Sequence, residues 1–139
     1  MAQPDLETVQ RIFSGWRTGD LSVEAGAFDP QLVFVVRDDF PEPRVVLGIV
    51  GVREYMRRFL AQFEHTTFAA EDLRAVGDTV LVRLVQRGTG TASGIQSELH
   101  FFMLFTFRGG KIIRMESVRH ERDALEAVGI ASLDELRYR

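Results

Sequence analysis

The sequence predicts an α+β fold, in which a curved, mostly antiparallel sheet wraps around about three N-terminal helices and a short C-terminal helix follows. The main observation is three strand-like runs joined by turn signals, at Thr79–Arg87, Ile95–Arg108 and Lys111–His120. Amphipathic stretches precede these runs, and a short helix starts near Glu121. Long antiparallel strands behind such helices form a concave apolar face, which is where small molecules bind.

Length and composition agree with one globular domain. The chain has 139 residues, of which 45% are hydrophobic and 27% charged, so we expect a single domain over residues 1–129 and a tail over 130–139. The net charge of -3 argues against a nucleic-acid partner, which would favour a basic surface. Lys111 is the only lysine among 17 basic residues, a bias that indicates a GC-rich bacterial source rather than a function.

The sequence predicts neither a membrane-spanning segment nor any cysteine chemistry. No stretch is apolar for long enough to span a bilayer, and no signal-peptide pattern opens the chain. The absence of cysteine excludes disulfides, thiolate nucleophiles and cysteine zinc sites. We therefore expect a cytoplasmic protein with no membrane partner.

The N-terminal third reads as helices followed by a short strand. Apolar residues recur at helical spacing from Leu6 to Trp16, and Gly19 ends that helix. Asp20 is placed to cap a second helix that runs through Phe28, and Asp29-Pro30 indicates a turn. A short apolar strand follows at 32–36, and the polar, proline-containing segment 37–48 is predicted to be a loop.

The rest of the chain reads as a third helix, a meander and a last helix. A buried stripe predicts a helix over Val52–Phe63, on whose outer side Glu54 and Arg58 pair across one turn. Phe68–Val76 is the next strand, and Gly109 and Gly110 form a tight hairpin before the last strand. The final helix covers 121–128, and a glycine at 129 stops it.

Alternation along the longest strand separates two different faces. One face is uniformly apolar and should pack on the helices; it holds Leu99, Phe101, Met103, Phe105 and Phe107. The other begins charged and becomes apolar; it holds Glu98, His100, Phe102, Leu104 and Thr106. Because a partly apolar sheet back suits a partner surface, we predict that a second copy covers it in a homodimer.

The last strand carries candidate polar groups for a site. Alternation places Ile113, Met115, Ser117 and Arg119 on one face and Ile112, Arg114, Glu116, Val118 and His120 on the other. Ser117 or Arg119 inside an apolar concavity would mark a site. The alternative is a strand end that leaves the core and becomes solvated.

The order of elements, with several short cues, resembles a known family. The cues are Arg17-Thr18-Gly19-Asp20-Leu21, Gly48 with Gly51-Val52-Arg53-Glu54-Tyr55, Phe107-Arg108-Gly109-Gly110-Lys111-Ile112-Ile113, and Arg122-Asp123-Ala124-Leu125-Glu126-Ala127-Val128-Gly129. In combination they resemble the SnoaL-like branch of the nuclear transport factor 2-like superfamily, which includes ketosteroid isomerase and limonene epoxide hydrolase. The resemblance implies a cone-shaped α+β fold with a deep pocket, usually a homodimer. Family members include isomerases, cyclases, hydrolases and non-catalytic domains, so the fold leaves function open.

Carried over residue by residue, the isomerase pattern is incomplete. The resemblance places a general-base aspartate at Asp39 or its neighbour Asp38. The family's oxyanion tyrosine falls at about Ile12, and its protonated aspartate falls at about Met103. Proton transfer beside a carbonyl needs a base and a donor to the developing oxyanion. Only the candidate base remains, so ketosteroid isomerase activity is rejected, and the Asp–Arg–Asp set of the epoxide hydrolase is not found.

Each candidate residue has an ordinary structural interpretation beside the functional one. Asp38 and Asp39 are either a base with a raised pKa or a solvated turn. Trp16 and Tyr55 are either ligand handles or packed core aromatics. His100 lies on the face opposite Met103, which favours an ion pair or a dimer contact over proton transfer at the site.

No cofactor is expected, and no metal site is predicted, because the three histidines lack ligand spacing. Two functions stay open. The first is a binding domain for a small apolar molecule, with a pocket shaped by Trp16, Tyr55, Phe59, Met103, Phe105, Met115 and Ser117. The second is a cofactor-free isomerase, cyclase or hydrolase in which Asp39 is the base, assisted by Asp38, and Arg119 stabilises negative charge.

Overall fold

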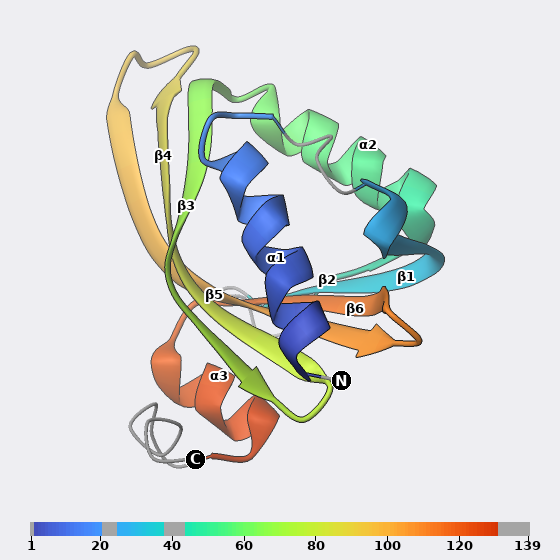
Figure 1. Ribbon diagram of the computed structural model, residues 1–139. Helices are drawn as coiled ribbons and strands as arrows, with labels where there is room; N and C mark the ends of the chain where they lie inside the picture. The colour runs from blue at the N-terminus through green and yellow to red at the C-terminus, as the bar shows by residue number, and fades with distance from the viewer. Residues whose placement is uncertain (1, 21–24, 38–43, 131–139) are drawn as a thin grey trace.

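A computed structural model of the protein describes residues 2–20, 25–37 and 44–130. The elements are α1 (Ala2–Trp16), a 3-10 turn η1 (Ala25–Ala27), β1 (Phe28–Arg37), β2 (Arg44–Leu47), α2 (Gly48–Leu60), β3 (Phe63–Val76), β4 (Thr79–Gly90), β5 (Gln96–Arg108), β6 (Lys111–Val118) and α3 (Glu121–Val128). Six strands form one sheet in the order β2-β1-β6-β5-β4-β3. The β1–β6 pair is parallel and the other pairs are antiparallel. Figure 1 shows the long strands curving around α1, with α3 on the opposite side, so the predicted fold class is confirmed.

The first helix forms where the apolar stripe predicts it. Val9, Ile12, Phe13 and Trp16 recur at helical spacing, and all four are buried in the main core. The helix ends at Trp16, and the chain then turns through Gly19, whose φ of 88° lies in the left-handed region that glycine adopts without strain. This end point matters for the site because it leaves the indole at the last turn of the helix.

The described part of the predicted second helix does not form an α-helix. Residues 25–27 form only a 3-10 turn, and β1 already begins at Phe28, so the predicted helix through Phe28 and the turn at Asp29-Pro30 are wrong there. The strand pairs with β6, and its register shifts between Phe28 and Val33. That irregularity accommodates the proline, which has no N–H for the ladder.

The third predicted helix is present but shifted towards the N-terminus. Structure begins earlier because β2, which falls inside the predicted loop, leads directly into α2 at Gly48. The helix ends at Leu60 because Phe63 already belongs to β3, which starts before the predicted Phe68. The predicted pairing of Glu54 with Arg58 is confirmed, with 3.0 Å between Oε1 and Nε.

The turns of the meander match their sequence signals. Gly109 and Gly110 have φ values of 58° and 79°, as a two-residue hairpin of type I′ requires. At the end of α3, Gly129 has a φ of 75° and its N–H donates to the carbonyl oxygen of Leu125. Both predictions are confirmed.

The two faces of β5 are those predicted, whereas one prediction for β6 is wrong. Phe101, Met103, Phe105 and Phe107 all belong to the core that α1 covers. On β6 the fully buried Ile112 belongs to the same core as Met115, although simple alternation places Ile112 on the opposite face. Thr106 pairs with Arg114 and Phe107 with Ile112, so Ile113 is an extra residue on β6, and this bulge turns Ile112 to the face that Met115 occupies.

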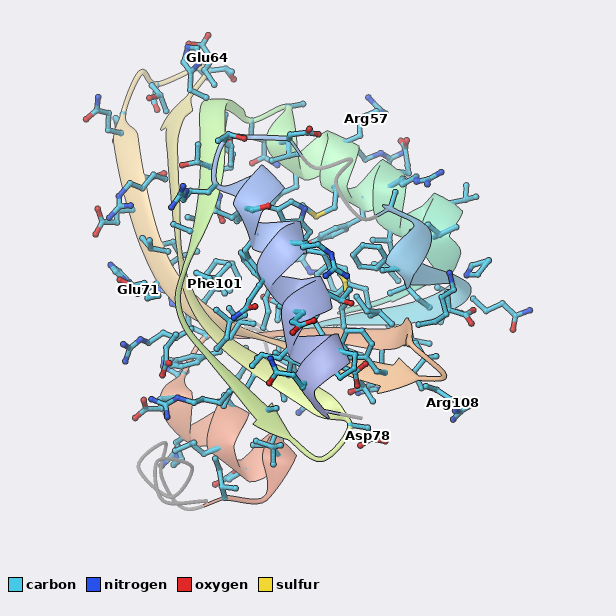
Figure 2. The ribbon with its side chains drawn as sticks, viewed as in Figure 1. Arg57, Glu64, Glu71, Asp78, Phe101 and Arg108 are labelled. Atoms are coloured by element: carbon cyan, nitrogen blue, oxygen red, sulfur yellow. The ribbon has the colours of Figure 1, made fainter. Side chains whose placement is uncertain are left out.

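The outer face of the sheet has a core of its own. Phe102, Leu104 and Val118 pack there with Ala124 and Leu125 of α3. Figure 2 shows the side chain of Phe101 on the concave side and that of Glu71 on the outer side. The apolar part of the outer face is thus covered by α3 of the same chain, which accounts for the feature behind the homodimer prediction. The homodimer itself stays a prediction.

Candidate functional site

A cavity of about 650 Å³ lies on the concave side of the sheet. Helix α1 packs mainly on β3 and β4, whereas α2 packs mainly on β1 and β2. The two helices therefore cover opposite margins of the sheet and leave its middle strands, β5 and β6, facing open space between them (Figure 1). Side chains from these middle strands, from α2 and from the last turn of α1 line that space.

The walls of the cavity are mostly aromatic and aliphatic. Tyr55 of α2 meets Phe34 of β1 edge to face, with 5.8 Å between the ring centroids. Across the cavity, Trp16 lies 5.8 Å from the ring of Phe68 on β3. Aromatic contacts of this kind fix the orientation of the rings, so the walls are preformed.

Most of the predicted pocket residues lie together on these walls. The lining includes Trp16, Tyr55, Phe59, Met103, Met115, Ser117 and Arg119. Phe105 does not line the cavity. It is fully buried beneath Trp16 and Phe13, with ring centroids 6.4 and 6.0 Å away. Its face was correctly predicted, but α1 covers that part of the strand. The predicted bases Asp38 and Asp39 lie outside the described residues.

Ser117 and Arg119 reach the cavity through the alternation of β6. Ser117 pairs with Met103 on one side and Val36 on the other, and all three line the cavity. Arg119 follows on the same face just beyond the end of the strand. It is exposed and it lines the cavity, and its role as a site residue stays a prediction.

Guanidinium groups surround the open part of the cavity. Arg37, Arg44, Arg53, Arg57 and Arg119 line it, and all five are exposed. Among the described lining residues there is no aspartate or glutamate. Among the described residues, the carboxylates that pair with these arginines belong to residues outside the lining.

Two of these arginines are held by carboxylates. Arg57 donates from Nη2 and Nε to the two carboxylate oxygens of Glu54, at 2.7 and 3.0 Å. This hydrogen-bonded pair lowers the pKa of Glu54 to about 2. Arg37 contacts Glu116 on β6. Arg53 and Arg119 make no ion pair with any residue that the structure describes.

Gln86 is a cavity residue that is absent from the predicted site. It lies on β4 in step with Val80, Val82 and Leu84, all of which point into the main core. Its residue surface is only 4% exposed, and it lines the cavity. A polar residue at an inward-facing position of an otherwise apolar strand was the signal that could have identified it.

The histidine on the long strand lies away from the cavity. His100 contacts Glu98 through Nε2 at 2.9 Å and Glu71 through Nδ1 at 3.3 Å. Its hydrogen bond to Glu98 raises its pKa above the ordinary 6.5. These contacts agree with the predicted ion pair, which forms when the imidazole is protonated, and the alternative of a dimer contact stays a prediction.

Two further features concern metals and membranes. Within residues 2–20, 25–37 and 44–130, no three His, Cys, Asp or Glu side chains gather closely enough to hold a metal ion. Over the same part of the chain, every helix is too short or too polar to cross a membrane.

Comparison with known proteins shows which family this sequence matches. Residues 9–115 match the family of SnoaL-like domains. No curated protein matches the chain in sequence.

Solved structures share the fold over nearly the whole chain. TerC, co-crystallised with polyporic acid, is 22% identical with a TM-score of 0.71, covering 91% of this chain and 99% of TerC. A proposed SnoaL-like polyketide cyclase from Jannaschia sp. CCS1 is 19% identical with a TM-score of 0.73, covering 94% and 95%. An NTF2-like protein of unknown function from Burkholderia pseudomallei K96243 is 16% identical with a TM-score of 0.72, covering 91% and 98%. At these identities the likeness concerns the fold, which is that of nuclear transport factor 2.

Proposed function

This chain belongs to the family of SnoaL-like domains, and from that premise we propose that it binds a small, mostly apolar molecule in the cavity between α1, α2 and β5. The observation that carries the proposal is the cavity itself. Its volume of about 650 Å³ lies within the usual range for small-molecule sites, and aromatic and aliphatic side chains form most of its wall. The few polar side chains among them supply orientation.

The single tryptophan gives a direct test. Trp16 lines the cavity and is the only tryptophan in the chain, so its fluorescence reports on what enters. We expect saturable quenching or a spectral shift with naphthalene, 2-acetonaphthone or polyporic acid as the probe. If none of the three probes changes the emission, the binding proposal is wrong.

A blocking variant separates the cavity from other surfaces. Ser117→Phe places a ring in the cavity and should weaken probe binding at least about tenfold, which corresponds to about 1.4 kcal/mol. Gln10→Phe adds the same ring on the exposed side of α1 and should leave binding unchanged. Equal weakening by both substitutions would contradict binding at this place.

A second candidate function is catalysis without a cofactor. The observation that favours it is Arg119, whose side chain lines an apolar cavity and makes no ion pair with a described residue. A guanidinium there stabilises negative charge that develops on a substrate oxygen. In this proposal Asp39 is the general base, Asp38 assists it, and the reaction is an isomerisation, cyclisation or hydrolysis.

Turnover of an aromatic poly-β-ketone ester tests this candidate, a choice guided by the cyclase among the structural neighbours. Asp39→Asn should lower kcat at least about 100-fold while the melting temperature stays nearly unchanged. Arg119→Gln should lower kcat by about 100-fold, and the exposed Arg122→Gln on α3 should not. Full activity of Asp39→Asn would eliminate the base, and no turnover by the unmodified protein would eliminate this reaction.

A further inference from the structure

We propose that Gln86 forms a hydrogen-bonding subsite in the cavity wall, which binds an uncharged acceptor oxygen, such as a ketone carbonyl, of the apolar ligand. The inference rests on the proposed binding function and adds the chemical class of the ligand. It assigns a role to an amide that packing alone leaves without a partner.

Gln86 is the anchor of this subsite. The residue is 96% buried, and its amide makes no hydrogen bond with any described residue. Its neighbours across the sheet are Phe68 on β3 and Leu99 on β5, which both line the cavity and offer no polar atom. The amide atoms are not fully enclosed, so they keep access to the cavity and are placed to pair with a polar group of a ligand there.

Trp16 lies near this anchor without joining it. Its indole Nε1 has no hydrogen-bond partner, but the atom is fully buried and is therefore closed to a ligand in the cavity. The ring is held by Phe13, with 5.1 Å between centroids, and by Phe68 at 5.8 Å. Phe68 is also the cross-strand neighbour of Gln86, so the Trp16 ring supports the wall beside the amide.

The chemistry of the amide selects the ligand. The amide of Gln86 donates through its NH₂ group, so a carbonyl oxygen is a suitable partner. A carboxylate does not fit, because the amide carries no compensating charge, whereas the arginines of the lining are all exposed. A neutral oxygen therefore belongs at Gln86, and an anionic group belongs at the exposed arginines.

Two probes of equal shape test the subsite. 2-Acetonaphthone carries a carbonyl where 2-isopropenylnaphthalene carries a methylene group, so only the first accepts a hydrogen bond. By isothermal titration calorimetry, we expect the unmodified protein to bind the ketone about 5- to 10-fold more tightly than the alkene. Equal affinity for both probes overturns the subsite and leaves the binding function intact. Binding of neither probe overturns the binding function as well.

Substitutions assign the preference to residues. Gln86→Leu should abolish most of the preference for the ketone and leave the alkene bound at least as tightly. Gln86→Met provides a second apolar variant of similar length if the leucine variant folds poorly. Gln96→Leu is the matched control, because Gln96 is an exposed glutamine of β5 that does not line the cavity, and the preference should survive there. An unchanged preference in both Gln86 variants overturns the assignment of the subsite to this amide.

Discussion

The two ends of the concave face are built from the same strands, but one end is packed by side chains of α1 and the other borders a cavity. At one end, Val9 and Ile12 of α1 close over Val82 and Phe105, and all four are fully buried. At the other end, Met103 lies only two residues from Phe105 on the same face of β5, and it borders a cavity. The comparison shows that the composition of a strand face does not decide whether it is filled.

The positions of the helices decide it. Helix α1 ends at Trp16 and packs mainly on β3 and β4, whereas α2 packs mainly on β1 and β2, so neither of these two helices packs mainly on β5, where Met103 borders the cavity. Interiors pack to high density wherever elements meet, so an apolar face without a covering element becomes the wall of a cavity. The filled end supplies stability, and the open end leaves the cavity in which we propose that a ligand binds.

Replacing a ring at the filled end is the strongest test of this comparison. Phe105→Ala should lower the free energy of unfolding by about 3–5 kcal/mol, because a fully buried ring is lost where neighbours cannot collapse. Met103→Ala removes a side chain that already faces open space, and it should cost clearly less. Urea denaturation of both variants measures the difference. Equal losses would mean that the open end is packed as tightly as the filled end.

The outer face gives a third, filled region for comparison. Leu125→Ala in α3 should destabilise the protein by about 2 kcal/mol, because this side chain packs against the outer core of the sheet. The neighbouring exposed Glu126→Ala should change stability by less than about 0.5 kcal/mol. Thermal melts compare the two variants. A neutral Leu125→Ala would show that α3 does not cover this face in solution.

At the open end, removing a polar group should have the reverse sign. Gln86→Leu should raise the free energy of unfolding of the ligand-free protein by about 1 kcal/mol, since an unpaired buried amide is replaced by an apolar side chain. Gln62→Leu at an exposed position should be nearly neutral. A loss of stability in Gln86→Leu would mean that the amide already has a partner at this end of the sheet.

The smallest expected effect lies behind the cavity, on the outer side of the same strand. The carboxylates of Glu98 and Glu71 favour protonated His100, so its pKa in the folded protein should exceed 6.5. The stabilisation is then fully present below the unfolded pKa and is lost as the pH rises through the folded value. NMR titration of the imidazole measures the pKa, and Glu98→Gln should lower it. If Glu98→Gln left the pKa of His100 unchanged, the contact between these two side chains would be absent in solution.

Local signals in the chain identified most elements. Alternation identified the inner side chains of β5, two consecutive glycines identified the hairpin, and Gly129 identified the end of the last helix. Signals that depend on distant partners were weaker. Strand β1 begins at Phe28 because it pairs with β6, and no local pattern distinguishes that from a turn at Asp29-Pro30.

The candidate site shows the same division. Seven of its residues were predicted from their faces alone, because period and polarity reveal which way a side chain points. Phe105 was wrongly assigned to the cavity lining, and Gln86 was missed. Both errors have the same cause, because the sequence does not show whether another element packs over a given side chain. Similarly, the bulge beside Thr106 turned Ile112 inward against simple alternation.

What the chain alone established is the α+β class, the inner apolar face of β5 and the family resemblance, since each depends on local spacing. Only the tertiary structure decided that the end of that face with Met103 is hollow while Phe105 is packed. The physical reason is that a cavity is a property of the distance between elements. Here that distance follows from α1 and α2 packing on opposite margins of one curved sheet.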